Sequence, residues 1–293
     1  MARLAGRALA WDIETDFART LVRARRLTLD DPQVIVERWP WPVRIHCLGQ
    51  FELQRDDQPL RFSRKAPKKP LELLKVLVTY GGEGVSEARL KDALWPDGEG
   101  DTEHQTFKMT LHRLRKLVGA ETIRHQQGQL SLNSAVCWLD VTTFEAALKL
   151  LDRPEPSLSE ADWENLHQAL SLYRGDFLPT DPDALWSIAR RDDLRRRFVK
   201  GAISVGRHFE RQARWEAGVV LYQHALTVEP SQELFYAGLM RAYCALEQRA
   251  AARDIYFRYW RVQGVENPDR RASSLDALFQ SLNLHQAQHG SIR

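Results

Sequence analysis

The sequence lacks the motifs on which most enzymes and metal sites depend. Its three cysteines, Cys47, Cys137 and Cys244, are odd in number and far apart, which argues against a disulfide framework and a CxxC metal site. We interpret them as small core residues. None of the nine histidines has HExxH spacing, and no GxxxxGK[ST] or GxGxxG loop could hold nucleotide phosphates. We therefore predict no metal, no cofactor and no enzymatic activity.

Long apolar runs are also missing. No run approaches the roughly 18 residues that a membrane span needs, and the first residues do not have the charged and then apolar order of a signal peptide. We therefore expect a cytoplasmic chain without a membrane partner. Its 293 residues and 43% apolar content suffice for one large core or for two to three ordinary ones.

The net charge of +3 is small, but its distribution is informative. Residues 43–138 carry 15 Lys or Arg against 12 Asp or Glu, and the rest of the chain is balanced at 27 of each. The excess positive charge therefore lies in one segment, and a cationic segment is favourable for binding the phosphates of nucleic acid.

Residues 1–42 read as an N-terminal helix followed by a linker. A helix-like stretch over 3–27 places Phe17, Leu21 and Val22 on one side, and the proline-rich run 39–42 then interrupts regular structure. The two tryptophans of that run could bind a partner, but packing under a domain edge is the simpler interpretation.

From residue 43 the apolar period changes to two, which predicts strands. Val43, Ile45 and Cys47 alternate with polar residues, and Phe51-Glu52-Leu53 follows beyond Gly49. A polar turn over 55–58 and a return over 60–62 would complete a small antiparallel sheet.

Two short helices are predicted next. Pro70 suits the first turn of a helix that Gly81-Gly82 ends, and Ser86 caps a second helix that stops at Pro96. The buried stripe of the first helix comprises Leu73, Leu74, Leu77 and Val78.

Residues 101–118 predict a third helix with two distinct faces. Apolar residues are spaced 4, 3 and 4 apart on one stripe, namely Phe107, Leu111, Leu114 and Val118. The opposite face carries Gln105, Met109, His112 and Lys116, flanked by Lys108, Arg113 and Arg115. Thr102 and Gln105 have capping-box spacing at the helix start.

A hairpin follows this helix directly. Residues 122–124 and 129–132 can pair around Gln126-Gln127-Gly128, whose glycine suits a tight turn. The order of sheet, three helices and hairpin is that of a winged helix, in which the third helix enters a major groove about 12 Å wide. The run 64–69 places four cations before the first helix, either as a DNA backbone contact or as a solubilising loop.

The order of these segments resembles a known family. VRIHCLGQFEL, KKPLELLKVLVTYGG, VSEARLKDALWP, the TLHRLRKLVG block and the GQLSLN wing resemble the OmpR/PhoB-type winged helix of regulators related to the Streptomyces antibiotic regulatory proteins. The segments 138–145, 173–178 and 239–243 are similar to their bacterial transcriptional activator domain, an all-helical, tetratricopeptide-like module. The resemblance implies binding to promoter DNA, usually by pairs of protomers, and recruitment of RNA polymerase.

An internal repeat supports the helical module. Residues 215–222 and 249–256 superpose at an offset of 34, which matches Leu221 to Ile255 and Tyr222 to Tyr256. Thirty-four is the tetratricopeptide period, so stacked helix pairs are expected. A compact helical bundle without a groove is the alternative. We thus divide the chain into an N-terminal helix and linker (1–42), a winged-helix domain (43–138), a helical domain (139–285) and a tail (286–293).

Three hypotheses about function remain. The leading one is a sequence-specific DNA-binding transcriptional regulator; the others are a protein-interaction adaptor with a winged helix that does not bind DNA, and an enzyme with an unrecognised site. Under the first, base edges would be read by Gln105, Lys108, Met109 and His112. Phosphates would be contacted by Arg113, Arg115 and Lys116, by the wing residues Arg124, His125 and Gln126, and by Arg64, Lys65, Lys68 and Lys69.

Overall fold

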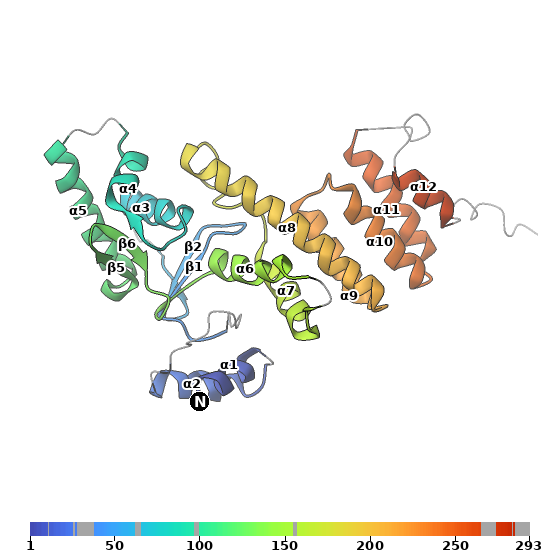
Figure 1. The fold of residues 1–293 in the computed structure, drawn as a ribbon, viewed down its shortest axis with the longest axis horizontal. Helices are drawn as coiled ribbons and strands as arrows, with labels where there is room; N and C mark the ends of the chain where they lie inside the picture. The colour runs from blue at the N-terminus through green and yellow to red at the C-terminus, as the bar shows by residue number, and fades with distance from the viewer. Residues whose placement is uncertain are drawn as a thin grey trace, which may run out of the picture. The chain divides into compact units, whose positions relative to one another are not determined.

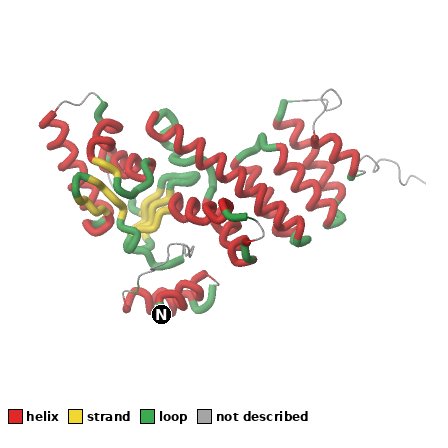
Figure 2. Tube along the Cα trace, viewed as in Figure 1, coloured by secondary structure: helices red, strands yellow, loops and turns green. Residues whose placement is uncertain are grey.

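The computed structural model describes residues 1–10, 12–25, 27, 38–61, 66–96, 100–154, 157–264, 274–282 and 284. These residues form two compact units: Met1–Lys149 with Arg174–Leu194, and Leu150–Tyr173 with Arg195–Arg293. We call them the first and the second unit. The strands belong to the first unit, and the second is helical (Figures 1 and 2). The predicted combination of a winged helix and a helical module is confirmed.

The first sheet of the first unit has the strand order β3-β2-β1-β7. β1 (Val43–His46) pairs antiparallel with β2 (Glu52–Arg55), and β2 pairs antiparallel with β3 (Gln58–Pro59). The return strand begins at Gln58, two residues earlier than the predicted 60–62, because Asp56 and Asp57 take φ values of 50° and 64° and close a two-residue turn. The Leu60 N–H still donates to the Leu53 carbonyl at 2.8 Å, and Phe62 lies outside the described residues. β7 (Cys137–Leu139), which the sequence did not predict, adds to β1 in parallel.

The two short helices are present. α3 (Lys68–Thr79) begins two residues before Pro70, which stays in the first turn, where a missing N–H costs little. Its predicted apolar stripe is buried, and the Gly82 N–H bonds the Leu77 carbonyl at 2.9 Å to end the helix. α4 (Glu87–Leu94) is capped by the Ser86 hydroxyl, which accepts from the Arg89 N–H at 3.4 Å.

The third helix, α5 (Gly100–Val118), buries the predicted stripe. Phe107, Leu114 and Val118 are fully buried and Leu111 is 5% exposed, and the helix packs against α3. The helical backbone already starts at Gly100, two residues before Thr102, and the Thr102 side chain, on which the predicted cap depends, lies outside the described side chains.

The predicted hairpin is confirmed. β5 (Ile123–Gln126) pairs antiparallel with β6 (Gln129–Leu132), and Gln127 and Gly128 form the turn with φ values of 51° and 71°. A short 3-10 helix, Ala120–Thr122, joins α5 to the hairpin. β4 (Val85–Ser86) adds a third strand beside β6.

The N-terminal segment differs from the prediction. Instead of one stretch it forms α1 (Ala2–Ala10) and α2 (Thr15–Arg25), because Asp12 and Glu14 take positive φ values that no helix continues through. Phe17 is 68% exposed rather than part of a buried side. Trp39 and Trp41 are buried, as the packing interpretation predicted.

The first unit extends beyond residue 139. α6 (Asp140–Leu148), followed by a 3-10 turn (Lys149–Asp152), begins with a buried carboxylate that accepts from the backbone N–H groups of Cys47 at 2.7 Å and Leu48 at 2.9 Å. Arg174–Leu194 also packs here: the Leu178 N–H bonds the Cys47 carbonyl at 2.9 Å, and Lys75 pairs with Asp181 at 2.5 Å. These residues therefore stabilise the winged helix.

Arg191 holds the loop of this segment together. Its guanidinium donates to the carbonyl oxygens of Phe177 at 2.9 Å, Asp181 at 3.0 Å and Pro182 at 3.1 Å. One side chain thus satisfies carbonyl groups that no regular structure would pair.

We expect Asp140→Asn to destabilise the first unit by about 1–3 kcal/mol. The Asp140 carboxylate accepts three backbone N–H groups, the third from Val141 at 2.7 Å, and an amide NH₂ in either orientation leaves at least one of them without an acceptor. Burial raises the pKa of Asp140 to about 7, so the folded natural chain loses stability as pH rises from about 4 to 7 and the neutral Asn variant does not. Urea unfolding is therefore best followed near pH 4, where this difference is small. Asp183→Asn, at an exposed aspartate of the same unit, should cost little, and equal losses in both variants would contradict the prediction.

The second unit is a stack of helices. It contains α7 (Glu160–Leu172), the later part of α8 (Leu185–Arg211), α9 (Trp215–Val228), α10 (Glu233–Ala245), α11 (Arg249–Val262) and α12 (Ser274–Ser281). α10 packs against α9, α11 and α12. The bounds of α9 and α11 differ by 34 residues at both ends, and Tyr222 and Tyr256 are both buried. The predicted repeat is therefore confirmed.

The cysteines take no part in disulfides. Cys47 and Cys137 are buried, as predicted for core residues, whereas Cys244 is half-buried.

Candidate nucleic-acid interface

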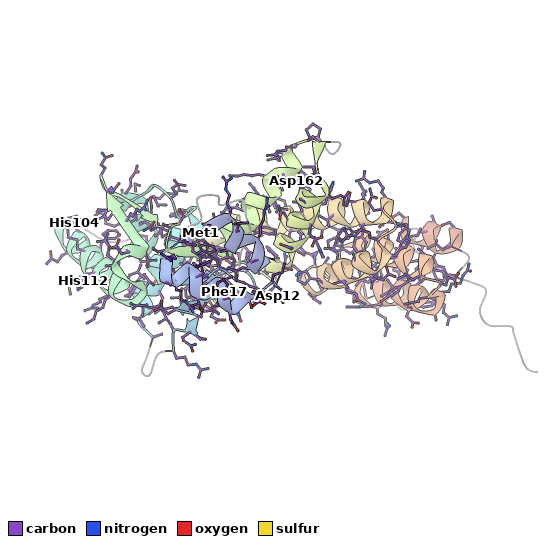
Figure 3. The ribbon with its side chains drawn as sticks, turned by 90° about the horizontal axis from the view of Figure 1, so that it is seen from below. Met1, Asp12, Phe17, His104, His112 and Asp162 are labelled. Carbon is purple, nitrogen blue, oxygen red and sulfur yellow. The ribbon has the colours of Figure 1, made fainter. Side chains whose placement is uncertain are left out.

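The outer face of α5 is a continuous polar surface. Gln105, Lys108, His112, Arg113 and Lys116 are all exposed, and Met109 is 51% exposed among them. His104 and His112 project from this helix in Figure 3. The structure thus brings the four predicted base-reading residues together, with Arg113 and Lys116 beside them. We call this set the outer face.

Contacts at both ends fix the orientation of α5. The Thr122 hydroxyl donates to the Val118 carbonyl at 2.7 Å, and the Trp95 and Phe107 rings meet edge to face at 6.5 Å. Arg115 donates through Nη2 to the Ile123 carbonyl at 3.0 Å and is only half-exposed. Its guanidinium therefore ties α5 to the start of β5, which distinguishes it from Arg113 and Lys116.

The three predicted wing residues separate onto two faces of the hairpin. His125 contacts the Glu87 carboxylate at the start of α4 through Nε2, and the Glu87 N–H bonds the Gly128 carbonyl at 2.9 Å. The hairpin is therefore anchored to α4 by a residue, Glu87, that the sequence reasoning did not single out. The only sequence signal for this contact was the position of Glu87 directly after the predicted cap Ser86, at the first residue of α4.

Arg124 and Gln126 lie on the other face of β5. They line a cleft of about 440 Å³ within the first unit, together with Gln129, Trp41 and Trp138. Arg124 and Gln126 are exposed, so both can reach a ligand or a nucleic-acid backbone beside the hairpin.

The basic run before α3 is only partly described. Lys68 and Lys69 are both exposed. Lys69 also donates to the Leu94 carbonyl at 3.1 Å, pairs with Glu72 at 3.2 Å and lies over the Trp95 ring. Lys69 thus packs α3 against the end of α4. Arg64 and Lys65 lie outside the described residues.

The structure also bears on two other classes of site, metal centres and membrane spans. Among the residues that it describes, no cluster of His, Cys, Asp and Glu side chains could hold a metal ion. Within the same part of the chain, no helix combines the length and apolar character that crossing a membrane requires.

Comparisons with known proteins agree with this architecture. Residues 139–277 match the family described as bacterial transcriptional activator domain. A solved structure of EmbR from Mycobacterium tuberculosis, in complex with a low-affinity phosphopeptide, is similar with a TM-score of 0.56 and 18% sequence identity. The match covers 85% of this chain and 67% of EmbR, and at this identity it shows a shared fold. A search of the curated proteins gave no match.

The family match covers most of the part of the chain that the sequence assigned to a helical module, and the similarity in fold to EmbR, which covers 85% of the chain, extends beyond that part. Residues 139–277 therefore match a bacterial transcriptional activator domain, and the chain shares the fold of EmbR.

Proposed function

We propose that this chain is a transcriptional regulator that binds promoter DNA sequence-specifically, with the outer face of α5 in the major groove. The observation that carries the proposal is the contrast between the two faces of this helix: one apolar stripe is buried, and the other face is polar, cationic and exposed. A helix held in this way presents side chains to base edges without loosening the core.

Within the outer face, the chemistry suggests a division of roles. Gln105 and His112 offer hydrogen bonds to base edges, Lys108 suits the acceptors of guanine, and Met109 suits a thymine methyl group. Arg113 and Lys116 carry charges that suit flanking phosphates. Lys68 and the wing residues Arg124, His125 and Gln126 would add contacts to the neighbouring backbone or minor groove. Arg115 could contact a phosphate only if its guanidinium group also kept its hydrogen bond to the Ile123 carbonyl.

The helical module supports a second part of the proposal. Stacked helix pairs present surfaces to proteins, and we propose that the second unit contacts a second protomer or RNA polymerase, which makes the regulator an activator.

The test is a titration of the full chain against promoter-derived and random duplexes at two salt concentrations. A DNA reader should lose affinity steeply as salt rises, because each neutralised phosphate releases about 0.9 counterion. No binding to either duplex at low salt would refute the proposal, and binding of a protein partner without DNA affinity would favour the adaptor hypothesis.

Single substitutions should separate base contacts from phosphate contacts. We expect Lys116→Ala to weaken binding to all duplexes alike. His112→Ala should instead narrow the difference in binding free energy between promoter and random DNA by about 1–3 kcal/mol. Both side chains are exposed on α5, so neither variant should alter folding. Equal losses on both duplexes for His112→Ala would reject a base-reading role for this residue.

A further inference from the structure

The second unit contains a groove that the proposed DNA contacts do not use. It has a volume of about 610 Å³ and lies between α8 and the turn that joins α9 to α10. The side chains that define it are Arg195, Val199, Lys200, Ile203, Arg207 and Glu229. We call it the α8 groove.

The charge of the α8 groove is strongly positive. Four of its lining residues are Arg or Lys and one, Glu229, is acidic. Glu229 pairs with Arg195 at 3.5 Å, so the attraction for an anion rests on Lys200 and Arg207 alone. Lys200 and Arg207 are exposed, and the described part of the chain provides no ion pair for either of them. The groove therefore favours an anionic occupant.

The floor of the α8 groove is aliphatic. Val199 and Ile203 lie one helical turn apart, are half-exposed, and alternate along α8 with Lys200 and Arg207. An occupant that covers this floor must present apolar groups between its negative charges, because burial of aliphatic surface adds to the charge attraction.

We propose that the α8 groove binds an acidic segment of a partner protein in which carboxylates alternate with aliphatic side chains. Duplex DNA fits less well: its phosphates lie on a convex surface and would leave Val199 and Ile203 without apolar contacts. The proposal does not depend on DNA binding by α5, because every residue that it uses belongs to the second unit.

The test uses the full chain and a short fluorescein-labelled peptide of alternating glutamate and leucine, with fluorescence anisotropy as the readout. We expect Lys200→Glu combined with Arg207→Glu to weaken binding of this peptide by about tenfold or more. Arg258→Glu combined with Arg261→Glu changes the charge equally at exposed positions of α11 outside the groove and should leave the affinity nearly unchanged.

Three results would overturn the proposal. The first is no binding of the glutamate and leucine peptide at low salt, or equal binding by the Lys200 and Arg207 variant. The second is equally tight binding of a peptide of glutamate and glycine, since the aliphatic floor would then contribute nothing. The third is a loss of affinity for promoter DNA, without a loss of peptide binding, in the same variant. Peptide binding is measured without DNA, so its failure is distinct from a failure of the proposed DNA-binding function.

Discussion

A variant with Arg113→Ala and Lys116→Ala should lose about 50-fold or more of its affinity for every duplex at ~0.1 M salt. Each of these two exposed cations, if it contacts a phosphate, releases about 0.9 counterion, which corresponds to a factor of about eight at that salt concentration. The slope of log affinity against log salt should fall by about 1.8 for the same reason. Electrophoretic or anisotropy titrations over a salt series measure both quantities.

A matched control separates specific contacts from net charge. Arg3→Ala and Arg25→Ala remove the same charge from exposed positions of α1 and α2, and this variant should keep most of its affinity and its salt slope. If both variants lose affinity equally, general charge attraction explains the binding and α5 has no special place in it. An unchanged slope in the α5 variant would also contradict the proposed interface.

The predictable parts of the structure were those that local patterns determine. The stripe of α5, the Ser86 cap and the turn at Gln127-Gly128 follow from helical spacing, capping chemistry and positive φ, so the sequence predicted them correctly. The outer face could be predicted for the same reason, because a helix that buries one stripe must expose the opposite one.

Long-range contacts were not predictable in the same way. β7 is three residues long and is recognisable only through its pairing with β1, which lies more than 90 residues earlier in the sequence. Asp140 reads as an ordinary helix-start acid, yet its carboxylate accepts from the N–H groups of Cys47 and Leu48. Arg115 and Lys69 count as cations in any sequence pattern, but no sequence pattern reveals their hydrogen bonds to the Ile123 and Leu94 carbonyls.

In the second unit, Gly238→Ala should lower the free energy of unfolding by at least about 3 kcal/mol, the upper part of the range for overpacked cores. Tyr222 is 2% exposed, and a Cβ atom at Gly238 would overlap its ring. A Cβ atom at Gly206 of α8 would overlap the same ring, so the ring has no free side to move toward. Thermal or urea unfolding of the full chain measures the loss.

Polar contacts hold the Tyr222 ring in place. Its hydroxyl donates to Glu210 at 2.8 Å, and Glu210 accepts two bonds of 2.9 Å from Arg241. α8, α9 and α10 are therefore joined around this ring, and a shift that relieves the overlap would also break these bonds. This network is the reason for expecting a cost at the upper end of the range.

Two further variants make the Gly238 prediction specific. Gly218→Ala lies in α9, where an added Cβ atom has no neighbour within 4 Å, and it should be neutral or should stabilise by up to about 1 kcal/mol, because alanine favours helix over glycine. In a Tyr222→Ala background, Gly238→Ala should cost far less than in the natural chain, because the ring that it overlaps is gone. An equal cost in both backgrounds would show that the close approach of α9 and α10 depends on something other than the tyrosine ring.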